Sequence, residues 1–301
     1  MTSASTKYAY FGHHKCASTW IQYLIHGLCK QVSLKHVVLP TRVSYKNDLV
    51  QYLMSYPADF ACVTNAEWNQ IEPILNDRKA FHVIRDPRDI VVSAYFSHLK
   101  SHIKDGWPEL TEIRHDLEAC SKTEGLIRTI DNLTALPIAG TRVNVFAAMH
   151  EWKYNHPDIL ELRYEDIIID PYGHFLRILR FLDLVDEAPF GLRAQLAWLT
   201  RYVSRTLLGP RNPPLRAARI PSPIALQIVQ DYSFERISGG RKKGKENTNA
   251  HFRKGVAGDW QNHFDPEISA YFYKRTGDLL SHIGYTDEVS APVTKPRGTK
   301  P

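Results

Sequence analysis

The chain has 301 residues, of which 43% are hydrophobic and 23% are charged. This composition supports a sizeable core and excludes a globally disordered chain. The formal net charge of +6 favours an anionic partner, such as a nucleotide, a nucleic acid or a membrane surface. No run of about 18 apolar residues occurs in the sequence, so we expect no membrane-spanning helix.

The cysteines and the first residues indicate the compartment. Cys16, Cys29, Cys62 and Cys120 are scattered, without Cys-x-x-Cys spacing, which is typical of a reducing environment. Residues 1–6 are polar and contain no signal-peptide core, and we expect no N-terminal membrane anchor. These features predict a cytoplasmic protein.

The first half of the chain alternates short apolar runs with amphipathic segments. Residues 7–12 are predicted to form a strand, and an apolar spacing of i, i+3, i+4 and i+7 then predicts a helix. That helical face consists of Ile21, Leu24, Ile25 and Leu28. Residues 12–18 are therefore a strand-to-helix loop. Further buried strands are expected at 37–39, 60–63 and 81–84, and a helix at 87–103.

The second half continues this pattern. A strand is expected at 159–164, and Asp-Pro pairs at 170–171 and 265–266 predict the starts of two helices, the last of which ends at Gly284. Residues 205–251 are rich in proline and basic residues, which predicts a long mobile loop with a helix possible at 225–232. Residues 286–301 are predicted to be a disordered tail.

Strand-helix alternation predicts an α/β fold in a single domain over residues 1–285. Its central parallel sheet is flanked by helices, with a P-loop-like strand-loop-helix at the N-terminus. Ligands of such sheets bind at the carboxyl ends of the strands. Lys15, Arg85 and Tyr164 each lie at or just after the end of a predicted strand, so we expect them to converge.

The loop before the first helix has the chemistry of an anion site. The first backbone N–H groups of a helix are unpaired and lie at the positive end of its dipole. Lys15 adds a full charge, and the hydroxyls of Ser18 and Thr19 add donors. The Walker A pattern Gly-x-x-x-x-Gly-Lys-Ser/Thr is absent.

Four separated segments, residues 11–20, 85–93, 164–166 and 252–260, read FGHHKCASTW, RDPRDIVVS, YED and FRKGVAGDW. Together and in this order, they resemble the nucleotide-binding elements of sulfotransferases that use 3′-phosphoadenosine 5′-phosphosulfate (PAPS). The resemblance implies a sulfotransferase-like fold and transfer of a sulfuryl group from PAPS to an acceptor hydroxyl or amine. Adenosine 3′,5′-bisphosphate (PAP) would be released, and no metal would be required.

The resemblance also assigns roles to individual residues. Arg85 and Ser93 would hold the 3′-phosphate, with Arg253, Lys254 and Gly255 as a second clamp, since an Arg fork suits a phosphate. Lys15 would neutralise charge on the leaving phosphate and sulfuryl oxygens. The remaining expected nucleotide ligands are Cys16, Ala17, Ser18, Thr19, Trp20 and Tyr164, the two aromatic residues against the adenine.

The loop departs from the family at two positions. The family usually has Ser and Gly where this chain has Cys16 and Ala17. If the family Gly has positive φ, Ala in its place costs about 1 kcal/mol. The loop is therefore expected to differ in detail.

The acceptor side has no clear family signature. Many relatives place a catalytic His in a Lys-Thr-His segment, and the corresponding position here is Asn65, which cannot act as a base. We expect Glu67 to be the general base if burial raises its pKa, with His14 and His36 as alternatives. The acceptor is expected to be a small molecule or another hydroxyl or amine group.

Two other function classes stay open. A nucleotide-binding protein that has lost transfer is suggested by Ala17 and Asn65. A basic nucleic-acid-binding module is disfavoured, because the basic residues cluster in a proline-rich stretch without a recognition motif. The dispersed histidines predict no metal site.

Overall fold

The computed structural model describes residues 7–56, 58–75, 78–102, 107–138, 140–187, 196 and 219–286. The predicted tail lies outside these ranges except for Thr286, as does the first part of the predicted loop, residues 205–218.

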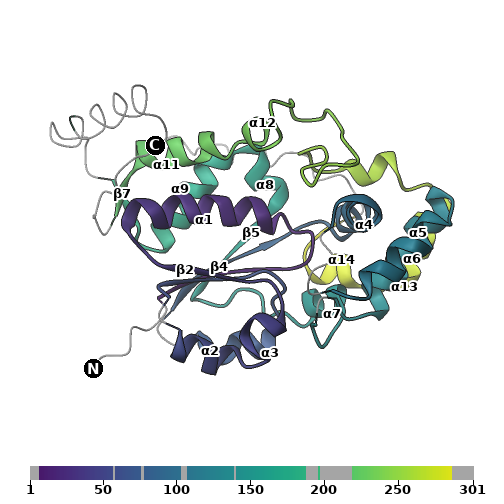
Figure 1. The fold of residues 1–301 in the computed structure, drawn as a ribbon, viewed down its shortest axis with the longest axis horizontal. Helices are drawn as coiled ribbons and strands as arrows, with labels where there is room; N and C mark the ends of the chain where they lie inside the picture. Colours follow the sequence, from purple (N-terminus) through teal and green to yellow (C-terminus); the bar gives the residue numbers. More distant parts are fainter. Residues whose placement is uncertain are drawn as a thin grey trace, which may run out of the picture.

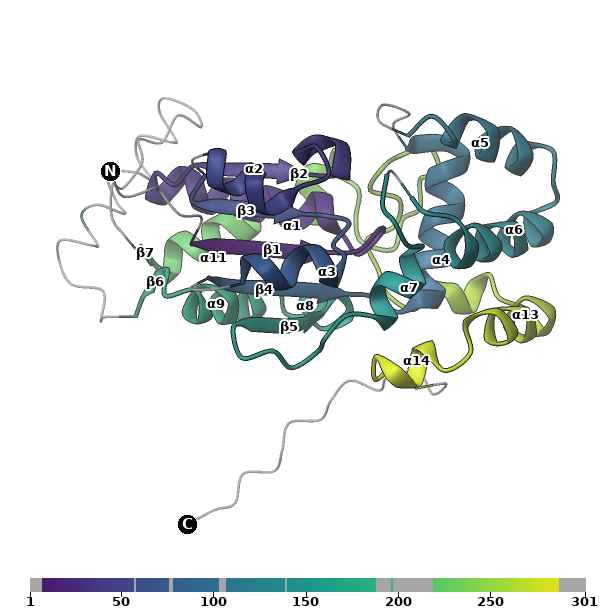
Figure 2. The same ribbon diagram turned by 90° about the horizontal axis from the view of Figure 1, so that it is seen from below.

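A five-stranded sheet forms the centre of the fold. Its strands are β1 (Tyr8–Gly12), β2 (His36–Leu39), β3 (Phe60–Val63), β4 (Lys79–Ile84) and β5 (Ile159–Arg163). The order is β2-β3-β1-β4-β5, and every neighbouring pair is parallel. All carboxyl ends therefore point to the same side, as Figure 2 shows. The predicted α/β class with a central parallel sheet is confirmed.

Helices cover both faces of the sheet and extend beyond its carboxyl edge (Figure 1). One face is covered by α1 (Ser18–Val32), α8 (Tyr164–Ile169), α9 (Pro171–Phe181) and α11 (Ser222–Asp231). The opposite face is covered by α2 (Leu49–Ser55) and α3 (Trp68–Ile71). Beyond the carboxyl edge lie α4 (Pro87–Phe96), α5 (Leu110–Glu118), α6 (Lys122–Ala135), α7 (Val145–His150), α13 (Pro266–Thr276) and α14 (Leu279–His282). Across the described ranges, no helix is long and apolar enough to cross a bilayer.

The predicted face of the first helix is confirmed. Ile21, Leu24, Ile25 and Leu28 are all at most 2% exposed and pack in one core cluster with Tyr10 and Phe81 of the sheet. This packing places the start of α1 directly at the end of β1, where the loop 12–17 turns back.

The helix that follows β4 differs from its prediction. Asp86 caps it by accepting from the Arg88 N–H, and α4 ends at Phe96 rather than continuing to residue 103. A π-helical turn, η3 (Ser97–Ser101), then follows, closed by the His102 N–H donating to Ser97 O at 2.7 Å. Such turns are rare in proteins overall, but those that occur are often found at functional sites.

The prediction for residues 205–251 is partly confirmed in its described part, because the helix considered possible at 225–232 is present as α11 and residues 238–251 form turns and loop, but a short strand and a second helix were not expected. Residues 219–251 contain β7 (Ile220–Pro221), which pairs with β6 (Val185–Asp186), and the helices α11 and α12 (Phe234–Ile237). The apolar side chains Ile224, Ala225 and Ile228 bury α11 against the core, which explains its order. The last predicted helix is divided into α13 and α14 by Gly277, whose φ is 58°. Three short 3₁₀ turns complete the description: η1 (Arg42–Tyr45), η2 (Glu72–Ile74) and η4 (Asp259–Asn262).

Candidate active site

A pocket of about 540 Å³ lies at the carboxyl edge of the sheet. Lys15 follows β1, Arg85 follows β4 and Tyr164 follows β5, and all three line this pocket as expected. Of the other expected nucleotide ligands, those in the lining are Ala17, Ser18, Thr19, Trp20, Ser93, Arg253, Lys254 and Gly255. Segments about 240 residues apart in the chain thus meet at one place.

The loop before α1 has the backbone that the sequence suggested. Lys15 and Ala17 have φ of 64° and 62°, in the left-handed region where a Cβ costs about 1 kcal/mol. Within the described ranges, no hydrogen bond uses the backbone N–H of Ala17, Ser18 or Thr19. These donors lie at the positive end of α1, so the loop can bind an anion.

The junction of strand and loop is fixed by close contacts. Tyr10 Oη donates to Ser18 Oγ at 3.2 Å, which orients the Ser18 hydroxyl. A Cβ on Gly12 would lie 2.4 Å from Tyr10 Oη. A side chain at Gly12 would therefore displace the Tyr10 hydroxyl from Ser18.

Cys16 does not line the pocket, which corrects the expectation that it binds the nucleotide. Its side chain is fully buried in the core cluster around Ile84 and Val91, and its N–H donates to His13 O at 3.1 Å. Because its side chain is buried in the core and its N–H is bonded to His13 O, Cys16 stabilises the loop from inside the protein and does not face the pocket.

Lys15 is half-buried in the pocket wall and lies near two other cations. Burial lowers the pKa of Lys15 to about 7, and the neighbouring Arg85 and Arg253 add to this effect. An anionic ligand in the pocket would stabilise the positive charges of Lys15, Arg85 and Arg253 together.

Arg85 lies between the loop and an aromatic ring. Its guanidinium carbon is 4.6 Å from the centre of the Tyr164 ring, and its Nη1 donates to Lys15 O at 3.3 Å. Its Nε is buried and has no hydrogen-bond partner among the described residues. Asp89 lies 3.5 Å from Nη2, so Arg85 is held in place with donor capacity left for a ligand.

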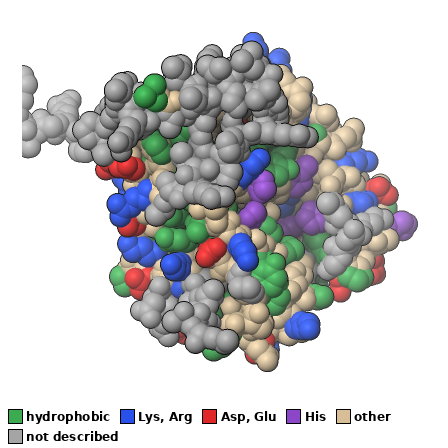
Figure 3. All heavy atoms as spheres, turned by 60° about the vertical axis from the view of Figure 1, so that its left-hand side comes forward, with side chains coloured by type: hydrophobic (Ala, Val, Ile, Leu, Met, Phe, Trp, Pro, Cys, Tyr) green, Lys and Arg blue, Asp and Glu red, His purple; other side chains and the backbone are tan. Residues whose placement is uncertain are grey.

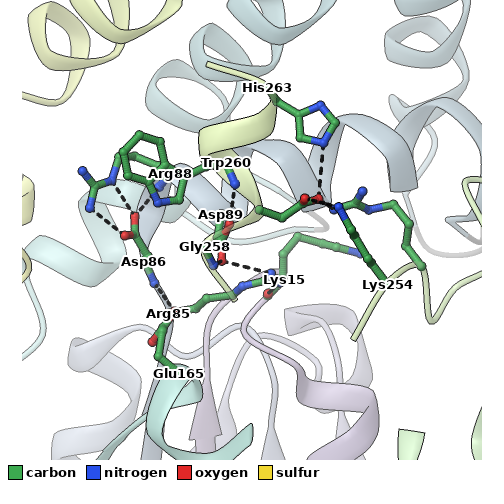
Figure 4. A network of polar contacts seen from close by, with 12 residues as sticks. Lys15, Arg85, Asp86, Arg88, Asp89, Glu165, Lys254, Gly258, Trp260 and His263 are labelled. Carbon is green, nitrogen blue, oxygen red and sulfur yellow. Dashed lines mark hydrogen bonds and ion pairs between the residues drawn. The ribbon is translucent and has the colours of Figure 1, made fainter. Parts of the chain in front are cut away.

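The start of α4 is tied to the segment that carries Arg253. Asp89 accepts hydrogen bonds from the N–H groups of Gly258 and Trp260 at 2.8 and 2.9 Å (Figure 4). Arg88 pairs with Asp86 at 2.7 Å and stacks 4.0 Å from the Trp260 ring centre. This network fixes two of the resembling segments against each other, although they are distant in the sequence.

Asp259 holds the two cations of the last segment. It pairs with Arg253 and Lys254, and Glu246 also pairs with Arg253. Burial opposes ionisation of Asp259, but hydrogen bonds from His263, Lys254 and Arg253 outweigh it and lower its pKa. Glu246, Asp259 and His263 could bring ligand atoms together for a metal ion, but the two cations on Asp259 disfavour a third.

Gly255 is required for a steric reason that the sequence did not indicate. Its φ is 70°, and a Cβ there would lie 2.4 Å from the ring of Phe234 on α12. The ring therefore packs directly on the backbone that follows Arg253 and Lys254.

Trp20 and Tyr164 form aromatic walls of the pocket. The Trp20 Nε1–H donates to Tyr232 O at 2.8 Å, which fixes the indole plane. Tyr164 is 7% exposed and lies under Arg85. Both positions are suited to stacking on a planar ring.

Glu67 contradicts the expectation that it is the general base. It is 3% exposed, does not line the pocket, and pairs with the buried Arg42 at 2.5 Å. Its other oxygen accepts from the N–H groups of Arg142 and Val143 at 2.8 and 3.1 Å. A carboxylate with both oxygens engaged in this way is structural, because it fixes two loops around an otherwise unpaired buried charge.

The other acceptor-side residues divide in two groups. Asn65 lines the pocket at the end of β3, and its Nδ2 donates to Pro40 O at 2.6 Å. His36 lies on β2 outside the pocket, where its ring contacts His26 edge-on. His14 lines the pocket directly beside Lys15.

Further pocket histidines were missed by the sequence analysis. His102 and His251 line the pocket with His14, and His98 lies behind them, fully buried. Figure 3 shows histidine side chains gathered in one hollow of the surface. Burial, followed by the Lys15 charge, lowers the pKa of His102 to about 3 and that of His251 to about 4. The four-residue spacing of His98 and His102 was the available signal.

Comparison with known proteins agrees with this geometry. The chain resembles Cytosolic sulfotransferase 3 of Arabidopsis thaliana, with 29% identity over 112 residues, and these cover 37% of this chain and 28% of that protein. The match thus spans less than a third of this curated relative. The crystal structure of mouse sulfotransferase SULT7A1 complexed with PAP has the same fold, with 15% identity, a TM-score of 0.54, and coverage of 92% of this chain and 84% of that one.

A family model of the sulfotransferase domain matches residues 12–190 and 220–284. These ranges include the loop, both arginine segments and the strands β2, β3, β4 and β5 of the central sheet. The chain therefore belongs to the sulfotransferase-domain family.

Proposed function

We propose that this protein transfers a sulfuryl group from PAPS to a hydroxyl or amine acceptor and releases PAP. The observation that carries the proposal is the pocket itself. One cavity combines the helix-start anion loop, the cations Lys15, Arg85 and Arg253, and the aromatic walls Trp20 and Tyr164. This set matches the two phosphate groups and the purine of PAP in number and chemistry.

Each cation has a place in the proposed reaction. The bond from sulfur to the nucleotide phosphate breaks while the acceptor oxygen or nitrogen bonds to sulfur, so negative charge develops on the leaving phosphate. Lys15 and the N–H groups before α1 would stabilise that charge, as in related in-line transfers. Arg85, Ser93 and Arg253 would hold the 3′-phosphate and so position the donor.

The nucleotide assignment is tested by binding. Arg85→Ala should weaken PAP by about 10- to 100-fold, the loss for a charged hydrogen-bond partner. The affinity for adenosine 5′-phosphosulfate, which lacks the 3′-phosphate, should fall much less. Arg219→Ala is the matched control, because Arg219 lies outside the pocket and pairs with Asp183 on the surface. Equal weakening of both nucleotides by Arg85→Ala would contradict the 3′-phosphate assignment.

Transfer is tested separately with labelled PAPS and a panel of phenols, alcohols and amines. Lys15→Ala should lower kcat strongly with a smaller change in PAP affinity, because its charge matters most in the transition state. PAP binding without transfer to any acceptor would favour a nucleotide-binding protein that has lost catalysis. Duplex binding that PAP does not displace would favour the nucleic-acid alternative.

The Arabidopsis relative is named as a cytosolic enzyme, and we propose the same compartment for this protein. The free thiols Cys16, Cys29 and Cys62 are all buried, which suits a reducing environment.

A further inference from the structure

We propose that His14 is the general base of this site and that His98 is its positioning partner, which selects the His14 tautomer and shares the proton. The inference rests on the proposed sulfuryl transfer and names the acceptor-side residues for it. It places the base on the anion loop, beside Lys15, rather than at the end of β3, where this chain has Asn65.

The two imidazoles form a direct pair. His14 Nε2 lies 2.9 Å from His98 Nε2, and the ring centres are 5.1 Å apart. His14 lines the pocket, whereas His98 is 1% exposed and lies behind it. Since Nε2 of His14 faces His98, its Nδ1 is the nitrogen left for a ligand in the pocket.

The π-helical turn η3 brings His98 to this place. Arg114 on α5 donates to His98 O at 2.7 Å and to His102 O at 2.9 Å, which holds the turn from outside. Trp107 packs edge-on against His14 and His98, with ring centres 5.7 and 5.0 Å away. A buried ring held by three segments is rigid enough to orient its partner.

The pair can move a proton in a balanced way. With the proton on His14 Nε2 donated to His98 Nε2, His14 Nδ1 carries a lone pair toward the pocket. As the acceptor oxygen bonds to sulfur, its O–H bond breaks and the proton forms a new bond to His14 Nδ1. The proton on His14 Nε2 can then pass to His98, so the positive charge is shared by two rings.

Burial, together with the neighbouring groups, keeps the pair neutral before this step. Lys15 on the loop, His102 directly after η3 and Arg114 on α5 face it, and His251 lies beyond His102 next to Lys15. Burial first, and then these neighbours, lower the pKa of both His14 and His98. A neutral imidazole is the form that can accept a proton.

His102 is the competing pocket imidazole. Its Nδ1 lies 3.4 Å from Ser97 Oγ, and it has no second imidazole within hydrogen-bond distance among the described residues. His36 is excluded because it lies outside the pocket, and it provides a matched His→Gln control.

The first experiment uses two phenols, one largely ionised at pH 8 and one with a pKa of about 10, as acceptors. His14→Gln should lower kcat for the weakly acidic phenol by about 100- to 10,000-fold, and much less for the ionised phenol, which needs no base. His98→Gln keeps a hydrogen bond but cannot take up a proton, so kcat for the weakly acidic phenol should fall about tenfold. In His98→Leu, kcat for this phenol should fall further, and His36→Gln should have the kcat of the wild type.

PAP affinity separates this inference from the proposed function. The His14 and His98 variants should bind PAP as wild type does, whereas failure of wild-type protein to bind PAP would refute the proposed function itself. If His14→Gln lowered kcat equally for both phenols, or if His102→Gln lowered it more than His14→Gln, the assignment of the base would be overturned.

A second measurement needs no acceptor. In ¹⁵N-histidine NMR of the full chain with PAP at pH 7.5, His14 should be protonated on Nε2 and bare on Nδ1, and His98→Gln should change that tautomer ratio. A proton on His14 Nδ1, with His98 as donor, would overturn the inference even if neither phenol reacts.

Discussion

The low pKa of Lys15 makes PAP binding depend on pH in a way that can be calculated. Burial, Arg85 and Arg253 lower the pKa of Lys15 to about 7, so above this pH the protein without nucleotide carries a largely neutral amine. Bound phosphates favour the ammonium and raise the pKa. PAP binding must therefore take up a proton at alkaline pH, and affinity must fall as pH rises.

The magnitude follows from the size of the shift. Each pKa unit is worth 1.36 kcal/mol, or a factor of ten in the equilibrium constant. With a pKa of about 7, about 24% of Lys15 is charged at pH 7.5 and about 1% at pH 9.0. The dissociation constant for PAP should rise roughly 20-fold over this interval, provided that bound Lys15 stays charged throughout.

Calorimetry at pH 7.5 and 9.0, in buffers of different ionisation enthalpy, measures both the affinity and the protons taken up. The nearby histidines have lowered pKa values, and the phosphate, whose second pKa is about 6, is already a dianion, so neither contributes. Lys15→Arg is the control, because arginine stays charged and the pH slope should vanish. Constant wild-type affinity without proton uptake would refute the reasoning.

Three substitutions test other parts of the site. Ala17→Gly should raise the free energy of unfolding by about 0.5–1 kcal/mol in urea denaturation, because it relieves a left-handed φ; unchanged stability would contradict this. Glu67→Gln should cost about 3 kcal/mol of stability, because it leaves the buried Arg42 unpaired, while kcat of the folded enzyme stays near wild type. Gly255→Ala should weaken PAP measurably in calorimetry, whereas Gly240→Ala, with positive φ but open space around it, should not.

The convergence of most expected nucleotide ligands on one pocket could be predicted from sequence because its signals are local. The apolar spacing of α1, the strand before Arg85 and the turn before Ser18 each depend on a few neighbouring residues. Parallel strands then bring their carboxyl ends together without further information. The positive φ of Ala17, which the sequence analysis raised only as a condition, also concerns a single backbone position.

The acceptor side could not be predicted because it depends on contacts between distant segments. The end of β3 was located correctly, and Asn65 reaches the pocket. Glu67, two residues later, turns to Arg42, a partner that no local pattern indicates. The His14–His98 pair joins residues 84 positions apart, and it depends on a π-helical turn that apolar periodicity cannot reveal.

The pairing of Arg253 and Lys254 with Asp259 has a consequence for selectivity. These cations are already neutralised by a carboxylate in the same segment, whose effective concentration is far above that of dissolved anions. Chloride or another weak monoanion therefore competes poorly for them. A phosphate dianion that is also held by Arg85 can displace the carboxylate. If Arg85 and Arg253 hold a 3′-phosphate as proposed, this pairing would favour ligands of higher charge and would keep abundant nucleotides without a 3′-phosphate from saturating the pocket.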